Sequence, residues 1–303
     1  LGVLLLAGSS YDALAYYGKK LLGFDTVLND TLKPLNEAGY GQEVGVSKTL
    51  RDGTVLTIDG VMSDENQFLV FYTLRNEEGI DWERGSIPTF RRVTGLFTNA
   101  PASHGSGSIN DEWTEFKGTA AFAPVSPFAK TLELHYTDAG AEDSITFPYR
   151  PSLAMRTKLK LALDAEAAVD AGRIRFDSLT ATPTSTYVEG RMYLETAGKE
   201  HRIHASLQGV RLLADGVEIA LQGMGQTSAP GGRTFQIRYD ALPESFDSLQ
   251  LLVDRFLGYA ELNIRIDLSN IAAAPGAAPE AERVPIGERT LQVRGLKPSN
   301  GRV

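Results

Sequence analysis

Residues 41–74 read GQEVGVSKTLRDGTVLTIDGVMSDENQFLVFYTL, and this stretch decides the fold class. Within it, Val55–Gly60 alternates between two faces, which is the two-residue period of a β-strand. The tripeptide Arg51–Gly53 stands just before that strand and contains Asp-Gly, a strong hairpin signal. After a polar turn, Phe68–Leu74 is rich in β-branched and aromatic residues. The stretch therefore predicts consecutive antiparallel strands joined by tight turns.

The same pattern continues along the chain as short strands separated by turns that contain Gly and Pro. Many short strands with this punctuation are typical of a β-sandwich. We therefore predict an all-β protein with two consecutive immunoglobulin-like β-sandwiches, preceded by a short helical segment. The further predicted strands are Thr89–Thr94, Glu115–Phe122, Thr131–Tyr136, Lys158–Leu163, Arg173–Leu179, Tyr187–Glu195, His201–Leu207, Gly209–Ala214, Thr234–Tyr239, Leu249–Val253 and Leu262–Leu268.

A proline-containing segment near mid-chain marks the predicted boundary between the sandwiches. Residues 148–158 read PYRPSLAMRTK and carry two prolines. The predicted division is a stub and helical segment at residues 1–40, a first sandwich at 41–150 and a second sandwich at 151–303.

Four segments do not follow the pattern of short strands and tight turns, or lie beyond the two sandwiches. Pro101–Ser108 is rich in Ser and Gly and predicts a turn-rich loop, and Ala165–Ala171 predicts a helical turn within the second half. Residues 271–280 are rich in Ala, Pro and Gly and predict a linker. Beyond this linker Arg289–Arg294 alternates again, so we expect a last strand that returns to the second sandwich.

Residues 10–39 have the spacing of helices rather than strands. Their apolar residues recur at intervals of three and four, so they share one face of a helix. These residues are Leu14, Tyr17 and Leu21 in a first piece, and Leu28, Leu32 and Leu35 in a second. Gly23 separates the two pieces, and Gly39 takes the usual place just past a helix end. Pro34 disfavours a regular last turn.

The two halves of the chain share a sequence pattern. Ile58–Val61 reads IDGV, and Phe176–Leu179 reads FDSL. Each is followed by a polar turn and then a strand, which is Phe68–Leu74 in the first half and Tyr187–Leu194 in the second. The pattern supports two copies of one sandwich, although alternating strands also converge on such patterns without a common origin.

The composition excludes several classes of function. Hydrophobic residues make up 42% and charged residues 22% of the 303 residues, as in a soluble globular protein. The formal net charge is −8 without a long basic run, which argues against nucleic acid as a main partner because phosphate binding needs clustered Lys and Arg. The chain contains no cysteine, so disulfides and thiolate metal sites are excluded.

The chain opens with LGVLLLAGSS at residues 1–10, an apolar start to a polar chain. The stub of a membrane span, the tail of a signal peptide and a buried strand all fit this stretch. Only Val3–Ala7 is continuously apolar, which is short of the roughly 18–20 residues of a complete span. Three tyrosines and two lysines follow within residues 11–20, and such residues favour a membrane–water boundary. An amphipathic helix packed on the first sandwich explains them as well.

The sequence contains no catalytic or metal-binding motif. Of the four histidines, His104, His135, His201 and His204, the last two lie three apart on a predicted strand and so face opposite sides. Zinc is therefore not expected. The sequence His-Gly-Ser-Gly from His104 predicts a loop tip rather than part of a catalytic triad. We expect a protein that is not an enzyme and that uses no metal and no cofactor.

Both tryptophans of the chain lie within clusters of acidic residues. The clusters are Glu77, Glu78, Asp81 and Glu83 around Trp82, and Asp111, Glu112 and Glu115 around Trp113. One interpretation is a face that binds a sugar or a cation, with the aromatic rings stacking on the ligand. The simpler interpretation is a solvated loop that its Trp anchors to the core. Trp82 and Trp113 are therefore the candidate ligand-binding residues.

Residues 41–74 resemble the DUF4179 family of Gram-positive bacteria. The resemblance is carried by Gln42-Glu-Val44, by the Ser-Lys-Thr-Leu-Arg-Asp-Gly turn that ends at Gly53, by the alternating strand and by the apolar strand that includes Tyr72. The segment before this block, ending in Asn-Glu-Ala-Gly39, resembles the segment that precedes it in the family. Residues 173–195, with Pro-Thr-Ser-Thr at 183–186, resemble the immunoglobulin-like DUF5643 domain that often follows.

The resemblance implies the ectodomain of a single-pass membrane protein that acts like an anti-sigma factor. It implies no catalytic residues, and binding to a sigma factor would need a cytoplasmic part that lies outside this chain. From it we interpret LGVLLLAGSS as the outer end of a membrane helix, with a signal-peptide remnant as the second choice. The expected function is an extracytoplasmic sensing or regulatory domain that binds an unidentified ligand or protein. The alternative is a cell-surface module that binds glycan or wall polymer.

Overall fold

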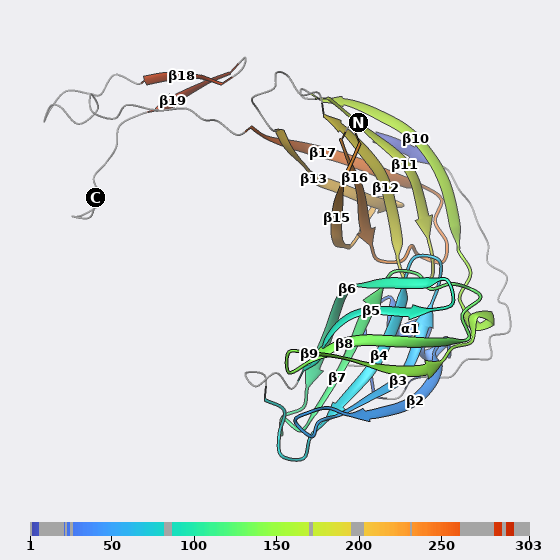
Figure 1. Ribbon diagram of the computed structural model, residues 1–303. Coiled ribbons are helices and arrows are strands. Elements are labelled where there is room, and N and C mark those ends of the chain that lie inside the picture. Colours follow the sequence, from blue (N-terminus) through green and yellow to red (C-terminus); the bar gives the residue numbers. More distant parts are fainter. Residues whose placement is uncertain are drawn as a thin grey trace, which may run out of the picture.

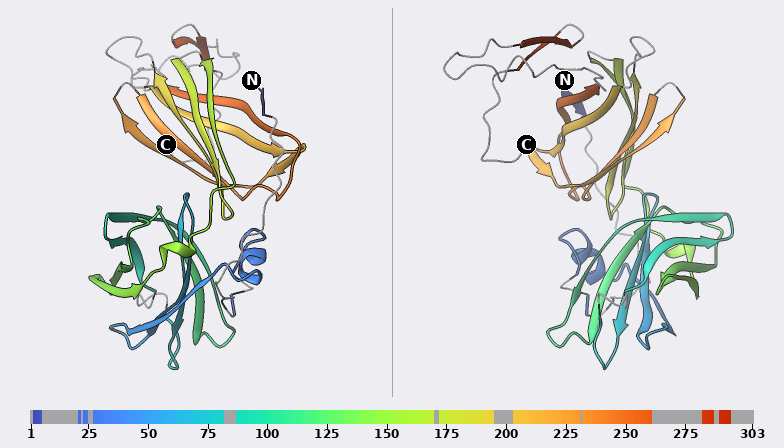
Figure 2. Two further views of the ribbon diagram at one scale, coloured as in Figure 1. Left: turned by 90° about the vertical axis from the view of Figure 1, so that its right-hand side faces the viewer. Right: turned by 60° about the vertical axis from the view of Figure 1, so that its left-hand side comes forward.

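The computed structural model describes residues 2–5, 21, 23–24, 27–81, 87–169, 172–194, 203–230, 232–260, 282–286 and 289–293. Over these residues the chain consists of strands, one short α-helix and one 3-10 turn, η1 (Pro151–Leu153). The strands form two sandwiches stacked end to end, and a two-stranded hairpin lies apart from both (Figure 1, Figure 2). The predicted all-β sandwich fold is confirmed.

The first sandwich has the strand order β2-β3-β4-β7-β6-β5-β8-β9, and every neighbouring pair is antiparallel. β6 belongs to both layers, because its first residues pair with β5 and its later residues pair with β7. Without β2, this is the A-B-E-D and C-F-G order of an immunoglobulin sandwich. The strands are β2 (Gln42–Thr49), β3 (Val55–Ser63), β4 (Phe68–Arg75), β5 (Thr89–Gly95), β6 (Thr98–Ile109), β7 (Glu115–Phe122), β8 (Thr131–Asp138) and β9 (Ala141–Pro148).

β4 is buried along almost its whole length because both of its faces are covered. Phe68, Val70, Tyr72 and Leu74 belong to the core between the two layers. Leu69 and Phe71, which alternate with them, pack on the outer side, where the segment that precedes β2 covers the sheet. This double covering explains why β4 is a continuous apolar run rather than an alternating strand.

The helix α1 (Leu32–Glu37) and the residues before it form that outer cover. Asn36 is fully buried, donates to the Leu21 carbonyl and accepts from the Leu21 N–H, both at 2.8 Å. Gly39 follows the helix with a φ of +80°, as predicted. Pro34 lies in the first turn, where its missing N–H removes no helical hydrogen bond. The first predicted helical piece lies mostly outside the described residues.

The second sandwich has one sheet in the order β10-β11-β12-β16-β15 and one in the order β1-β17-β13-β14. Its core is formed by the apolar side chains that these two sheets turn toward each other, among them Phe176, Val188, Ile237 and Tyr239. The strands are β1 (Gly2–Leu5), β10 (Leu159–Val169), β11 (Gly172–Ala181), β12 (Thr186–Leu194), β13 (Ile203–Ala214), β14 (Val217–Ile219), β15 (Leu221–Ala229), β16 (Gly232–Tyr239) and β17 (Leu249–Ala260).

β1 takes the place of strand G in the second sandwich. In the first sandwich strand F is β8, and strand G is the next strand, β9. In the second sandwich strand F is β17, and β1 pairs with it antiparallel, with Val3 opposite Leu251 and Leu4 opposite Gln250. The interpretation of this stretch as the end of a membrane helix is therefore wrong for Gly2–Leu5, which form a strand. Within the described part of the chain, no helix is both long enough and apolar enough to cross a membrane.

The last strands of the chain also differ from the prediction. β19 (Arg289–Val293) pairs with β18 (Glu282–Ile286) in a hairpin of its own, and not with a strand of the second sandwich. The prediction of a last strand rested on alternation alone, which specifies a strand but not its partner.

The two sandwiches repeat one another in detail. β3 and β11 each carry a bulge at an aspartate, Asp59 in the first and Asp177 in the second. Asp59 accepts a hydrogen bond from Thr73 at 2.8 Å, and Asp177 pairs with Arg191 at 3.0 Å. Thr73 and Arg191 occupy equivalent places on β4 and β12. The structure thus supports the two-copy interpretation of the sequence pattern.

Two segments expected to be loop or helix are strands. Pro101–Ser108 lies within β6, where Gly105 and Gly107 let β6 approach β7 closely. The predicted helical turn at Ala165–Ala171 falls on β10 as far as Val169, which pairs with β11. In both segments small residues weaken the local strand signal, and pairing with a neighbouring strand decides the outcome.

Candidate functional site

The two sandwiches meet through equivalent turns. Residues 64–67 join β3 to β4, and residues 182–185 join β11 to β12. The same backbone bond closes each turn, from the Asp64 N–H to the Gln67 carbonyl at 3.1 Å and from the Thr182 N–H to the Ser185 carbonyl at 2.9 Å. Hydrogen bonds also run from one turn to the other. The repeat therefore supplies both halves of the junction.

The carboxylate of Asp64 is the centre of this junction and is only 5% exposed. It accepts hydrogen bonds from the Thr184 hydroxyl and from the Thr184 N–H across the junction. Within its own turn it accepts from the N–H groups of Asn66 and Gln67 at 2.9 and 3.1 Å. Burial raises the pKa of Asp64 above its ordinary value, and the Thr184 hydroxyl opposes that rise. Four donors on one buried carboxylate, two of them from the other sandwich, link the two turns.

Two side-chain amides complete the contact between the turns. The Asn66 amide donates to the carbonyls of Thr180 and Ser185, both at 3.0 Å. The Gln67 amide donates to the Thr184 hydroxyl at 2.9 Å, while its own oxygen is buried without a partner among the described residues. The junction is therefore polar rather than hydrophobic, and polar interfaces of this kind allow domains to move relative to each other.

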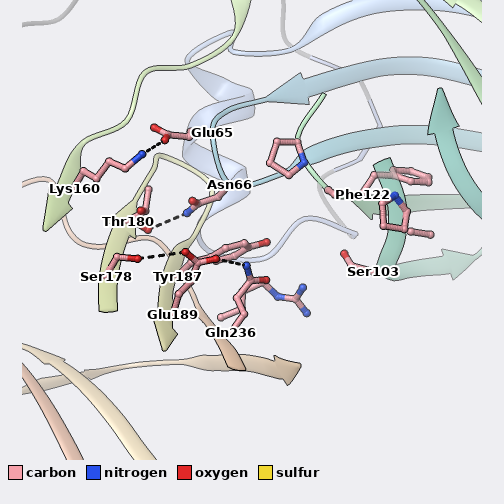
Figure 3. Close-up of a pocket in the computed structure, with 15 residues that line it drawn as sticks. Glu65, Asn66, Ser103, Phe122, Lys160, Ser178, Thr180, Tyr187, Glu189 and Gln236 are labelled. Carbon is pink, nitrogen blue, oxygen red and sulfur yellow. Dashed lines mark hydrogen bonds and ion pairs between the residues drawn. The ribbon is translucent and has the colours of Figure 1, made fainter. Parts of the chain in front are cut away.

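A cleft opens beside the junction, with one wall from each sandwich (Figure 3). Its cavity measures about 440 Å³. Figure 3 shows Ser103 and Phe122 of the first sandwich across the cleft from Gln236 of the second. At one end Glu65 links the walls through its ion pair with Lys160. The other lining residues are Asn66, Pro101, Ala102, Ala123, Pro124, Ser178, Thr180, Tyr187, Glu189 and Arg238.

The wall from the second sandwich is the polar outer face of β11, β12 and β16. Glu189 accepts hydrogen bonds from the Gln236 amide at 3.0 Å and from the Ser178 hydroxyl at 3.3 Å. Burial raises the pKa of Tyr187, and the nearby Arg238 opposes that rise. Donors and acceptors thus alternate over a flat sheet face, which suits a ligand rich in polar groups.

Two further hollows share residues with this cleft. A cavity of about 610 Å³ shares Glu189 and Gln236 and continues over the same sheet toward Arg191. A cavity of about 380 Å³ shares Arg238 and is lined by His104. Partial burial of the His104 ring and the positive charge of Arg238 lower the pKa of His104 to about 4. This imidazole is therefore neutral at physiological pH.

The tryptophans predicted as ligand-binding residues are not in the cleft. Trp113 lies in the turn between β6 and β7, 52% exposed and with a φ of +60°. That turn leads into β7 at Glu115, whereas Phe122 at the other end of β7 lines the cleft. Trp82 lies outside the described residues. The two acidic segments do adjoin, because the Ile80 N–H donates to the Trp113 carbonyl at 2.7 Å.

Sequence reasoning missed the cleft because its residues lie on turns and strand faces that resemble ordinary solvent-facing positions. The one available signal was that the polar tetrapeptides at 64–67 and 182–185 occupy the same place in each half. His104 lies on β6 rather than at a loop tip, and the side chains of His201 and His204 are outside the described part. Among the described residues, no three side chains of metal-binding type gather in one place.

The N-terminal quarter of the chain is similar to a known family. Residues 1–76 match the family DUF4179, a domain of unknown function. The match ends one residue beyond β4. It includes all of residues 41–74 and therefore supports the resemblance seen there. The DUF5643-like character of the second sandwich stays a prediction.

Two further comparisons concern the whole chain. No curated protein matches it in sequence. Among solved structures, a conserved domain protein from Bacillus anthracis is similar with a TM-score of 0.47 and 14% identity, over 67% of this chain and 74% of that chain.

Proposed function

We propose that this chain is the extracytoplasmic, ligand-binding part of an anti-sigma-factor-like membrane protein and that it acts by binding rather than by catalysis. The observation that carries the proposal is the cavity of about 440 Å³ lined by both sandwiches. A ligand that contacts both walls favours one relative position of the two domains. Binding in the cleft is therefore a means of converting an external ligand into a change of domain arrangement.

The regulatory part of the proposal rests on the resemblance to DUF4179 and on the match over residues 1–76. Proteins of this kind have a cytoplasmic part, one membrane span and an ectodomain. We place the sigma-factor contact in that cytoplasmic part, outside these 303 residues. The proposed membrane anchor must lie outside Gly2–Leu5, because these residues pair with β17.

The alternative function is a cell-surface module that binds glycan or wall polymer without signalling. The polar sheet face around Glu189 and Gln236 favours such a ligand. A transcription reporter for the cognate sigma factor separates the two functions in cells that carry the full-length protein. If the protein is a regulator, filling the cleft changes reporter output. If it is a surface module without signalling, reporter output does not change.

Ligand binding in the cleft is tested by filling it. We expect Ser178→Trp to abolish binding to a panel of neutral and acidic oligosaccharides, peptidoglycan fragments and polyol phosphates, because the indole occupies the cavity that Ser178 lines. The matched variant Trp113→Ala lies at the other end of β7 and keeps binding. Loss of binding in Trp113→Ala, with binding retained in Ser178→Trp, would move the site to the acidic loops.

The extracytoplasmic location is tested with a single cysteine, since the chain has none of its own. Phe128 is 67% exposed, so Phe128→Cys provides an accessible thiol. On intact cells that carry the full-length protein, we expect labelling by a membrane-impermeant maleimide. Labelling only after the cells are lysed would contradict the location.

A further inference from the structure

We propose that Arg238 is an anion-binding residue of the cleft and that the ligand is a hydroxyl-rich chain carrying a carboxylate or phosphate group. The inference rests on the proposed binding function and goes further by naming the chemistry of the ligand. Arg238 lies on β16 opposite Tyr187 of β12, and it lines both the cleft and the cavity beside His104. The Arg238 side chain thus borders two cavities at the junction.

The fold leaves room for this guanidinium over the neighbouring strand. A Cβ atom on Gly223 of β15 would lie 3.2 Å from the Arg238 Nη2 atom. A larger residue at Gly223 would push the guanidinium away from the strand. The space above the Gly223 backbone therefore helps to position Arg238 beside the cleft.

Arg238 differs from the other cations of the cleft and of the hollow beside it because it lacks a carboxylate partner. Lys160 pairs with Glu65, and Arg191 pairs with Asp177. Arg238 forms no ion pair within the described residues, and its Nε atom is buried there without an acceptor. A buried guanidinium N–H without an acceptor is costly, and a ligand oxygen that accepts from the same guanidinium offsets part of that cost.

Two carboxylates near Arg238 already have other donors. Glu189 accepts from Gln236 and Ser178. Asp240 accepts from Gln222 at 2.8 Å. Burial of the His104 ring is the main cause of its lowered pKa, and the positive charge of Arg238 is the second cause. Among the described residues the site therefore has a cation that is hydrogen-bonded to Tyr187 but has no carboxylate partner, and a neutral imidazole lines the same cavity.

The shape of the site favours a chain rather than a compact ion. The cleft of about 440 Å³ and the hollow of about 610 Å³ share Glu189 and Gln236, so they form one groove over the outer face of the second sandwich. Along this groove the side chains present amide, hydroxyl and carboxylate groups, which match the hydroxyls of sugars or polyols. Two sources supply this chemistry, an oligosaccharide with uronic acid units and a polyol phosphate.

The test compares binding of three probes by calorimetry, namely a uronic acid oligosaccharide, an oligomer of glycerol phosphate and a neutral oligosaccharide of equal length. We expect one of the acidic probes to bind, and Arg238→Gln to weaken that binding about 10-fold or more, because a charge-assisted hydrogen bond is lost. The matched control is Arg91→Gln, which changes an exposed arginine of β5 outside the cleft and leaves affinity unchanged. The thermal unfolding curve of each variant verifies that it is folded.

Each outcome decides between the two proposals. Equal affinity of Arg238→Gln and the unchanged protein for the acidic probe overturns the role of Arg238. Binding of the neutral probe alone overturns the anionic ligand and leaves the binding function of the cleft intact. If none of the three probes binds and the wider panel identifies only ligands that Ser178→Trp still binds, both proposals fail.

Discussion

Asp64 carries the contact between the sandwiches, because its one carboxylate meets donors from both turns. We expect Asp64→Asn to lower the free energy of unfolding by about 1–3 kcal/mol, since the NH2 that replaces one carboxylate oxygen cannot accept from the donors facing that oxygen. Urea unfolding followed by circular dichroism measures this change. Asp111→Asn, in the exposed turn between β6 and β7, is the matched control and is expected to have almost no effect.

The same carboxylate predicts a pH dependence of stability. Burial raises the pKa of Asp64 above its ordinary value of 3.8, so the folded state holds the proton more tightly than the unfolded state. The stability from this group is therefore complete below about pH 3.8 and is lost as pH rises through the raised pKa. We expect the stability difference between the native protein and Asp64→Asn to shrink over that range. A difference that grows with pH would show that hydrogen bonding, and not burial, dominates this group.

The sequence is least informative about the environment of single residues. Asp64, Asn66 and Gln67 belong to a polar tetrapeptide between two strands, which is the usual composition of a solvent-exposed turn. Their burial depends on a second turn more than a hundred residues further along the chain, so no local pattern reveals it. Trp113 is the opposite case. An aromatic residue among acidic ones is a conspicuous local pattern, but this residue lies away from the cleft.

At the scale of elements, the glycines of β6 decide whether this segment pairs as a strand. A Cβ atom on Gly107 would lie 2.1 Å from the Phe116 ring and 2.8 Å from the Lys117 carbonyl oxygen. We expect Gly107→Ala to destabilise the protein by about 1–3 kcal/mol through this overlap. Gly225→Ala on β15 is the control, since no atom lies within 4 Å of the added Cβ. Equal melting temperatures for the two variants would contradict this pairing of β6 with β7.

The pairing of β1 with β17 is tested by an engineered disulfide. Leu4 and Gln250 are opposite each other, so Leu4→Cys with Gln250→Cys is expected to oxidise readily in a chain that has no other cysteine. Leu5→Cys with Gln250→Cys is one residue out of register and places the two thiols on opposite faces. Mass spectrometry after mild oxidation distinguishes the pairs. Equal crosslinking of both pairs, or of neither, would contradict β1 as strand G.

Elements with a strong local pattern are predictable from this sequence. The Arg51–Gly53 turn, the apolar strand β4 and the Gly39 helix end all occur where their residues place them. Strands built from small residues are not predictable, because Ser, Gly and Ala give neither alternation nor β-propensity, and β6 forms through pairing with its neighbours. The partner of a strand is not predictable from a local pattern either. β1 pairs with β17, and β19 pairs with β18 instead of a strand of the second sandwich.

At the scale of the whole molecule, the duplicated sandwich explains where the candidate site lies. The equivalent turns at 64–67 and 182–185 join the two copies, and the cleft opens beside that junction with walls from both. The alternating pattern was enough to predict two sandwiches. It could not predict the cleft, because a site between domains depends on how the two copies meet.

The most direct measurement of the central claim is an NMR titration of the ¹⁵N-labelled protein with the tightest-binding compound of the ligand panel. If the ligand binds between the sandwiches, the amide signals of Ser103 in the first sandwich and of Ser178 and Gln236 in the second shift together, with one common dissociation constant. Shifts confined to the turn around Trp113, with these three amides unmoved, would contradict the account.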